Sequence, residues 1–300
     1  MNIFLQRYKK ILGEDYDKLQ QVRLRTSIRV NTLKIGKKEL LKRLENKNAV
    51  LEETGFSDCG YFIKSRFSAG SAPEYLQGYY YIQDAAAQLP AEVLIPSEDD
   101  VVLDMAAAPG GKTTQLAQMM KNKGVLVALD KASSRLMALR NNLERMGVAN
   151  CIAYKMDSRK AEELGVKFDK ILLDAPCSGS FIKDRKWFDK KTVEGFAEMA
   201  NLQKELVKTA VSLLKKNGTL VYSTCSMEPE ENEEVIHWAL KTLNIKLEKI
   251  KLNCGDDCGD EALTGFLGRK YNPEVRKCIR IWPHKTGTQP FFMAKITMLE

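Results

Sequence analysis

The sequence predicts an α/β protein in which a doubly wound parallel sheet follows a small α+β module. From residue 101 onward, strand-like stretches alternate with helical ones, which is typical of βαβ units and of a parallel sheet covered on both faces. Residues 1–80 contain short strands around one helix instead. The length of 300 residues also exceeds the roughly 100–200 residues of an ordinary domain. We therefore expect a domain over 1–80 and a second one over 81–300.

Composition excludes several classes of protein. The chain is 44% hydrophobic and 29% charged, which is ordinary for a globular protein and too hydrophobic for a disordered one. No apolar run approaches the ~18 residues of a membrane span. Residues 1–10 mix apolar residues with Arg7, Lys9 and Lys10, unlike a signal or transit peptide. We expect a cytoplasmic protein without a membrane partner.

Positive charge is concentrated at the start of the chain. The net charge is +8, and residues 1–80 hold 15 Lys and Arg against 9 Asp and Glu, whereas residues 81–300 hold 32 against 30. A basic module joined to a nearly neutral one indicates a polyanionic partner that the first binds and the second processes. The alternative is a protein that is merely rich in lysine.

Seven scattered cysteines do not resemble a disulfide framework. Cys254 and Cys258 have loop-like spacing, but no second pair accompanies them and neither His237 nor His284 lies nearby in the sequence. We expect no metal site. A reducing compartment is the simplest setting, and the surplus thiols then include candidate nucleophiles.

The first module reads as one helix among strands. Residues 27–33 alternate as a strand, and 36–47 place leucines on one face of a surface helix. Residues 50–53 and 61–64 form two further short strands, and the module ends near Gly78.

The second part contains five strand candidates with helices between them. The strands are 101–105, 125–130, 151–157, 170–174 and 219–225. The helices are 133–146, with Gly147 as a stop, 197–214, and 229–243, with Pro229 in the first turn and acidic residues after it.

Every one of these strands finishes with an acid or a thiol. Ligands of such sheets bind outside the carboxyl ends of the strands. A single Asp there is usually a turn residue or a helix cap, but five groups at one rim indicate a site. They are Asp104, Asp130, Asp157, Asp174 and Cys225.

The loop after the first strand, residues 103–113 (LDMAAAPGGKT), is rich in small residues and leads into a helix N-terminus. It is not a P-loop, because Ala106 stands where that motif needs Gly, and the dinucleotide fingerprint is absent. S-adenosylmethionine is the remaining common ligand of this fold. Asp130 is positioned for its ribose hydroxyls and Asp157 for its adenine side.

Two thiols follow the fourth and fifth strands. Cys177 lies in 173–179 (LDAPCSG) and Cys225 in 222–226 (YSTCS). These strands are neighbours in a doubly wound sheet, so we expect both sulfurs at the same rim.

With these motifs the sequence resembles the Sun/Fmu (Nop2/Sun, RsmB-like) family of RNA cytosine-5 methyltransferases. The strongest matches are 103–113, 173–179 and 222–234 (YSTCSMEPEENEE). Weaker ones are 29–34, 81–84 (YIQD) and 280–295 with its Phe-Phe pair. The resemblance implies a Rossmann-like class I methyltransferase sheet over 81–300 and a small RNA-binding α+β domain over 1–80.

The resemblance also implies roles for individual residues. Cys225 would be the nucleophile, Cys177 would assist product release, and Asp174 and Lys112 would act beside them. The cofactor S-adenosylmethionine would be bound by Ala106, Ala107, Ala108, Pro109, Gly110, Gly111, Lys112, Asp130, Arg135, Asp157 and Asp174.

Two cysteines suit this chemistry. Carbon 5 of cytosine is a poor nucleophile until a thiolate adds to carbon 6, which is covalent catalysis by a thiol whose pKa must be lowered. In DNA cytosine-5 methyltransferases the nucleophile belongs to a Pro-Cys pair, which would select Cys177; the Thr224-Cys225 pair selects Cys225. The bland alternative is that both are buried core thiols.

The sequence departs from the family at two places. Ala106 replaces a usual Cys, and residues 180–187 replace a longer stretch. Residues 183–188 mix basic and aromatic side chains, which suits either phosphate contact and stacking of a flipped base or anchoring of the loop on the core. Arg23, Arg25 and Arg29 are candidates for RNA backbone contact, or else form a solvated basic face.

The implied activity is methylation of carbon 5 of cytosine in RNA. By analogy with compact relatives, tRNA is favoured over rRNA. Rival readings are a DNA methyltransferase that uses Cys177, a non-catalytic RNA-binding module, and an amine methyltransferase. We expect a monomer. The sequence leaves the target cytosine and the need for an accessory protein open.

Overall fold

The computed structural model describes residues 2–252, 254–255 and 258–299. The helices are α1 Ile3–Leu12, α2 Tyr16–Gln20, α3 Lys37–Glu45, α4 Pro73–Leu76, α5 Leu89–Leu94, α6 Gly111–Met119, α7 Ser133–Met146, α8 Trp187–Lys190, α9 Val193–Ser212, α10 Glu233–Thr242 and α11 Pro283–Thr286. The strands are β1 Ser27–Val30, β2 Val50–Glu53, β3 Gly60–Lys64, β4 Tyr80–Ile82, β5 Val101–Asp104, β6 Val125–Asp130, β7 Cys151–Lys155, β8 Phe168–Asp174, β9 Leu214–Thr224, β10 Ile245–Glu248, β11 Asp260–Glu261, β12 Gly265–Phe266, β13 Arg269–Lys270, β14 Ile279–Ile281 and β15 Phe291–Met298.

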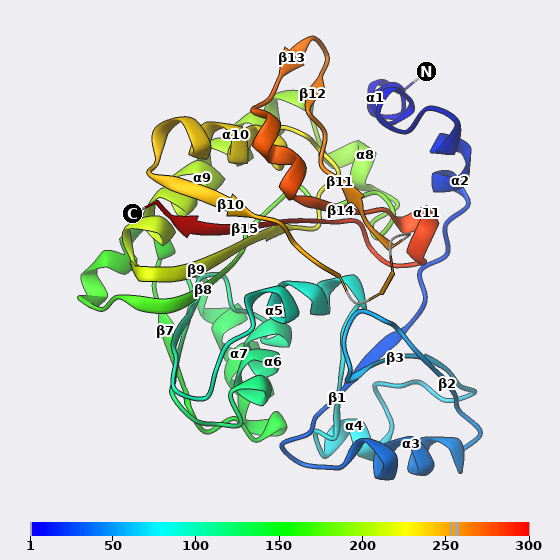
Figure 1. Ribbon diagram of the computed structural model, residues 1–300. Coiled ribbons are helices and arrows are strands. Elements are labelled where there is room, and N and C mark those ends of the chain that lie inside the picture. The colour runs from blue at the N-terminus through cyan, green and yellow to red at the C-terminus, as the bar shows by residue number, and fades with distance from the viewer. Residues whose placement is uncertain (1, 253, 256–257, 300) are drawn as a thin grey trace.

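The main sheet confirms the predicted α/β class (Figure 1). Its parallel part has the spatial order β7-β6-β5-β8-β9, and β15 then adds antiparallel to β9. Because β5 is the first strand of this sheet and later strands are added on both of its sides, the order reverses between β5 and β8. A crevice at the carboxyl ends of these two strands is where such folds bind ligands.

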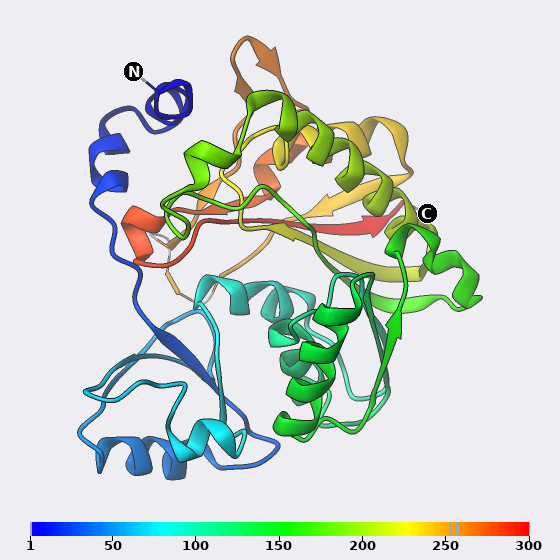
Figure 2. The ribbon, with the colours of Figure 1, turned by 180° about the vertical axis from the view of Figure 1, so that it is seen from behind.

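Alternate residues of the strands build two core layers. Leu103, Ile171 and Leu173 pack with α9 and α10 on one face, while Val102 and Leu172 pack with α5 and α6 on the other. Figure 1 and, from behind, Figure 2 show these helices on opposite sides of the sheet. Burial on both faces explains why the strands are continuously apolar.

A smaller antiparallel sheet, in the order β2-β3-β1-β4, stands beside the main one (Figure 1). Leu40 and Leu44 of α3 are fully buried against Ile28 and Val30 of β1. The predicted helix 36–47 and the strands around it are therefore present, with ends that differ by at most three residues.

Arg29 corrects one prediction. The sequence suggested an RNA-contacting or solvated side chain, but it is fully buried between the two sheets. Its guanidinium donates to the Gly111 carbonyl at 2.6 Å and to Thr114 Oγ1 at 2.8 Å. Burial lowers its pKa to about 10. Arg29 thus fastens the small sheet to the start of α6 instead of meeting RNA, whereas Arg23 and Arg25 are exposed.

Residues 3–20, which we call the N-terminal segment, lie apart from the small sheet and against the main one (Figures 1 and 2). Phe4 and Tyr8 of α1 pack in one apolar cluster with Trp187, Phe196 and Trp282. The centroids of the Phe4 and Trp187 rings are 5.1 Å apart in an edge-to-face arrangement.

Other details differ from expectation. The helix predicted over 197–214 covers 193–212, and the strand predicted over 151–157 ends at Lys155. The helix predicted from Pro229 begins at Glu233, because residues 229–232 form turns that the buried groups described below hold in place. The last parallel strand begins at Leu214 instead of 219. Cys254 and Cys258, expected to be reduced thiols, are joined by a disulfide. Across the described ranges, no helix has the length and hydropathy to cross a bilayer.

Candidate active site

The loop between β5 and α6 is fixed against its neighbours. The Ala107 N–H donates to the Leu129 carbonyl at 2.9 Å. Gly110 has φ +109°, and a Cβ there would lie 3.0 Å from Leu139 Cδ1, so glycine lets the loop pack on α7. At the loop's start, burial raises the pKa of Asp104 to about 6 while Thr113 Oγ1 donates to it at 2.7 Å.

A first cavity of about 330 Å³ opens beside this loop. Asp130 and Asp157, the two carboxylates that we expect at the cofactor, both line it. Arg135 connects Asp130 with the loop between β5 and α6. Its Nε lies 3.3 Å from Asp130 Oδ2, and a guanidinium N–H donates to the Ala108 carbonyl at 2.7 Å. The ion pair with Arg159 lowers the pKa of Asp157 to about 2, so that carboxylate stays charged.

The first cavity has the chemistry that an adenosine group requires. Carboxylates of Asp130 and Asp157 can accept hydrogen bonds from hydroxyl and amino groups. Met156, Leu202 and Leu206 supply an apolar wall for a ring. The residues present therefore fit S-adenosylmethionine.

A second cavity of about 250 Å³ adjoins the first. Ala106, Ala108 and Asp174 line both. Cys177 belongs to the first cavity and Cys225 to the second. The two cavities thus meet at the end of β8, each with its own sulfur.

Asp174 is held by two donors at this junction. Lys112 Nζ lies 2.6 Å from Asp174 Oδ2, and Ser223 Oγ donates to Oδ1 at 2.9 Å. Lys112 Nζ also lies 5.2 Å from the centre of the Phe291 ring. Lys112, predicted to act beside the thiols, therefore orients Asp174 and lines the second cavity.

The two sulfurs are in contact. Cys177 Sγ and Cys225 Sγ are 3.3 Å apart. The hydrogen bond from Cys177 lowers the pKa of Cys225, and the charges of Lys112 and Lys183 also lower it. The same hydrogen bond, together with burial, raises the pKa of Cys177. The lowered pKa of Cys225 and the raised pKa of Cys177 both favour Cys225 as the thiolate of the pair.

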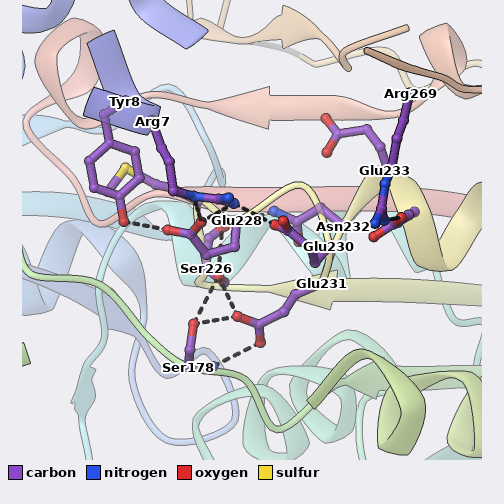
Figure 3. A network of polar contacts seen from close by, with 12 residues as sticks. Arg7, Tyr8, Ser178, Ser226, Glu228, Glu230, Glu231, Asn232, Glu233 and Arg269 are labelled. Atoms are coloured by element: carbon purple, nitrogen blue, oxygen red, sulfur yellow. Dashed lines mark hydrogen bonds and ion pairs between the residues drawn. The ribbon is translucent and has the colours of Figure 1, made fainter. Parts of the chain in front are cut away.

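A buried acidic network includes Ser178 and Ser226, the residues that follow the two cysteines (Figure 3). Glu231 accepts hydrogen bonds from both serines. Tyr222 Oη donates to the Glu231 carbonyl at 2.6 Å. The turns at 229–232 are fixed by these bonds.

The N-terminal segment joins this network from the other side (Figure 3). The Arg7 guanidinium lies 2.9 Å from Glu228 Oε2 and 2.6 Å from Glu230 Oε2. Tyr8 Oη also donates to the fully buried Glu228. Burial raises the pKa of Glu228 to about 7.

The basic and the aromatic side chains of the loop 183–188 lie in different surroundings. Trp187 is buried, donates from its indole N–H to the Ser178 carbonyl at 2.8 Å, and packs on Phe4, so it anchors the loop. Lys183 lines the second cavity, and Arg185 and Lys186 are exposed. The aromatic residues Trp187 and Phe188 therefore belong to the core cluster.

Sequence reasoning missed several residues of the second cavity. Tyr81, Gln83 and Asp84 from one chain segment and Gln289 and Phe291 from another line it. The YIQD and Phe-Phe stretches resemble the family, but neither contains a motif that indicates a role. The available signal was the pair of polar residues Gln83 and Asp84 within an otherwise apolar stretch.

Comparison with known proteins gives two family matches. The family of the 16S rRNA methyltransferase RsmB/F matches residues 91–297, and the N-terminal domain of the 16S rRNA methyltransferase RsmF matches residues 2–85. The tRNA (cytosine(49)-C(5))-methyltransferase of Pyrococcus abyssi is 39% identical over 308 residues, which cover 98% of each chain. The 28S rRNA (cytosine-C(5))-methyltransferase of Mus musculus is 40% identical over 277 residues.

The mouse alignment covers 90% of this chain and 34% of the mouse protein, so the chain spans about a third of that relative's length. Among solved structures, a methyltransferase homolog protein from Pyrococcus horikoshii is 40% identical, with a TM-score of 0.89 over 99% of this chain and 95% of that one. NSun6 from Pyrococcus horikoshii, solved with SFG, is 27% identical, with a TM-score of 0.85 over 99% of this chain and 97% of that one.

Proposed function

The chain belongs to the RsmB/F family of 16S rRNA methyltransferases, and we propose that it transfers a methyl group from S-adenosylmethionine to carbon 5 of cytosine in RNA. Relatives that act on tRNA and on rRNA are both near 40% identical to it. We propose tRNA as the substrate, because the archaeal tRNA enzyme matches the chain over 98% of both proteins, whereas the alignment covers only 34% of the mouse rRNA enzyme.

S-adenosylmethionine, when bound, supplies an electrophilic methyl group on a sulfonium ion. Asp130 would accept hydrogen bonds from its ribose hydroxyls, and Asp157 would lie at its adenine side. Arg135 fixes Asp130 and the loop 106–112, so it acts on cofactor binding through those groups. The similar structure of NSun6 was solved with SFG, an analogue of this cofactor, which supports S-adenosylmethionine as the ligand of the first cavity.

The observation that supports this function best is the division of the two sulfurs between two joined cavities. A base in the second cavity would meet Cys225, Asp174 and Lys112, while the cofactor cavity ends at the same carboxylate. This arrangement favours Cys225 over Cys177 as the nucleophile. It therefore disfavours the rival assignment, based on DNA methyltransferases, in which Cys177 attacks the base.

The proposed step begins with the Cys225 thiolate. Its sulfur forms a bond to carbon 6 of cytosine, and the electron pair of the 5,6 double bond becomes available at carbon 5, which takes the methyl group. Asp174 can accept a hydrogen bond from the cytosine amino group, and Lys112 can stabilise negative charge on the ring. A base from solvent then takes the proton from carbon 5, and the electron pair of that bond restores the 5,6 double bond as the sulfur–carbon bond breaks and returns the Cys225 thiolate. The Cys177 thiol lies 3.3 Å from that sulfur to assist its departure.

Further parts of the proposal concern partners and setting. The basic residues of 1–80 would bind the RNA, with Arg23 and Arg25 exposed for that purpose. We propose a monomeric, cytoplasmic enzyme whose catalytic domain covers 81–300. The RNA-modifying activity of the relatives supports a location where RNA is processed.

The test is methyl transfer from labelled S-adenosylmethionine to separate pools of tRNA, rRNA and duplex DNA, followed by nucleoside analysis. We expect label in 5-methylcytidine of tRNA. Label confined to rRNA would show that the reaction is as proposed but that its substrate is rRNA. Label in DNA, in an amine, or in no nucleic acid would overturn the proposal.

A further inference from the structure

Glu231 connects the two loops that carry the cysteines. Its Oε2 accepts the backbone N–H of Ser178 at 2.8 Å and a Gln203 amide N–H at 3.1 Å. Its Oε1 accepts the Ser226 hydroxyl at 2.9 Å and the Ser178 hydroxyl as well. Ser178 follows Cys177, and Ser226 follows Cys225, so one carboxylate is bonded to the neighbours of both sulfurs (Figure 3).

The hydrogen-bond donors around Glu231 suit an ionised carboxylate, whereas its burial opposes the charge. Four donors point at its two oxygens, and a carboxyl proton would displace one of them. Burial raises the pKa of Glu231, and the bonds from these donors oppose that rise. The side chain has no exposed surface and no cation among these contacts. A buried charge satisfied only by such donors is expensive to place, and groups of this kind concentrate where function needs them.

Three further hydrogen bonds hold the surroundings of this carboxylate in place. Gln203 on α9 also donates to the Pro176 carbonyl at 2.9 Å, next to Cys177. On the other side, Asn232 donates to the Ser226 carbonyl at 2.9 Å and accepts the Thr224 hydroxyl at 2.6 Å. Each cysteine is therefore bracketed by residues that bond to Glu231 or to its neighbours.

From this geometry we propose that Glu231 is a positioning residue that holds the two cysteine loops in register, so that the sulfurs of Cys177 and Cys225 stay in contact and keep different roles. The inference rests on the proposed cysteine-dependent methyl transfer. It assigns the difference in role between the two sulfurs to a residue that lines neither cavity.

The charge of Glu231 adds an electrostatic effect of the same sense. The pKa of Cys177 is raised first by its hydrogen bond with Cys225 and by burial, and the Glu231 charge raises it further. Lys112 and Lys183 act on Cys225 in the opposite direction. Glu231 thus helps to keep the proton on Cys177 and the negative charge on Cys225.

The test uses Glu231→Gln, which keeps the shape and removes the charge. Glu234→Gln, a helix residue three positions away that pairs with the exposed Arg269, is the matched control. The first measurement is the rate at which iodoacetamide alkylates each thiol of the RNA-free protein across pH, resolved by peptide mass spectrometry. We expect Glu231→Gln to lower the ratio of the Cys225 rate to the Cys177 rate by about tenfold, since one pKa unit changes the thiolate fraction tenfold.

The second measurement is methyl transfer to RNA. We expect kcat to fall about 10–100-fold with an unchanged KM for RNA, because small misplacements of reacting groups cost rates of this order. Glu234→Gln should match the wild type in both measurements. Should Glu231→Gln melt earlier yet keep the wild-type ratio of alkylation rates and kcat, Glu231 would be a structural residue only, and the inference would be wrong.

Two milder variants keep the test decisive if Glu231→Gln does not fold. Ser178→Ala and Ser226→Ala each remove one hydroxyl donor to the carboxylate, and each should lower the alkylation ratio and kcat in the same direction. Wild-type values in both would overturn the inference. If the wild type methylates no RNA, the proposed function fails, while the alkylation measurement still decides whether Glu231 sets the difference between the thiols.

Discussion

Lys112 Nζ lies 2.6 Å from Asp174 Oδ2, at the point where the two cavities of the site meet. The pair comes from the start of α6 and the end of β8, so the crossover after the first parallel strand and the strand beside it build one wall. The ammonium group also acts on Cys225, whose pKa it helps to lower. One lysine therefore serves the carboxylate and the thiol.

Replacing Cys177 by Ala should leave an RNA–protein adduct that survives denaturation. Cys225 can still add to cytosine, but the thiol 3.3 Å from its sulfur is missing when that sulfur has to leave. The adduct is measured as a retarded band on a denaturing gel. Cys225→Ala should abolish methylation, form no adduct and still bind cofactor. An adduct that forms only through Cys177 would reverse the two roles.

Lys112→Met should shift the reactivity of Cys225 to higher pH. The pKa of Cys225 is lowered first by its hydrogen bond from Cys177 and then by charges that include Lys112, so loss of that charge raises it. Below the pKa, each unit of rise reduces the thiolate fraction about tenfold. Alkylation of the RNA-free protein from pH 6 upward measures the shift. Lys186→Met, on the exposed loop, serves as control, and equal profiles for both variants would contradict the prediction.

Asp130→Asn should weaken cofactor binding. The Asp130 carboxylate faces the first cavity, with its Oδ2 3.3 Å from Arg135 Nε. Hydrogen bonds to a charged group contribute about 1.5–3 kcal/mol, or roughly 10–150-fold in affinity. Calorimetric titration with S-adenosylhomocysteine measures this. The exposed Asp189→Asn variant is the control. Undiminished affinity of Asp130→Asn would remove this residue from the cofactor site.

Arg7→Ala should destabilise the fold in a pH-dependent way. Burial raises the pKa of Glu228 to about 7 from 4.5, so the stability that this group contributes is fully present below pH 4.5 and is lost as pH rises through about 7. Without Arg7 the charged form is also unpaired, which costs about 3–5 kcal/mol for a buried pair. Urea unfolding at pH 5.5 and pH 8 should show the larger loss at pH 8.

The control for that experiment is Lys10→Ala, an exposed residue of the same helix. Its free energy of unfolding should follow the wild type at both pH values. An equal loss for Arg7→Ala at pH 5.5 and pH 8 would show that Glu228 keeps its charge throughout, against the argument from burial.

Local signals explain which parts of the fold could be predicted. The strand 125–130 and the helix 133–146 are confirmed at both ends, because apolar periodicity and the Gly147 stop are properties of adjacent residues. The rim of strand ends follows from topology, since parallel strands place their carboxyl ends together. The cofactor loop could be found because its small residues exclude the other phosphate-binding motifs.

Contacts between distant segments explain what could not be predicted. Arg29 is buried by Gly111 and Thr114, which lie more than eighty residues away in the chain, and nothing near it in the sequence indicates that. In the sequence, Glu231 is one of several acids that favour a helix start. Only the fold shows that its carboxylate faces both cysteine loops while Glu230 faces Arg7.

The contacts of α1 have a consequence for the order of folding. Phe4 and Tyr8 pack with Trp187, Phe196 and Trp282, all of which are distant from them in the chain. Contacts between distant residues form slowly, because the entropy of closing the intervening loop must be offset first. We therefore expect the ion pairs of Arg7 with Glu228 and Glu230 to form late in folding.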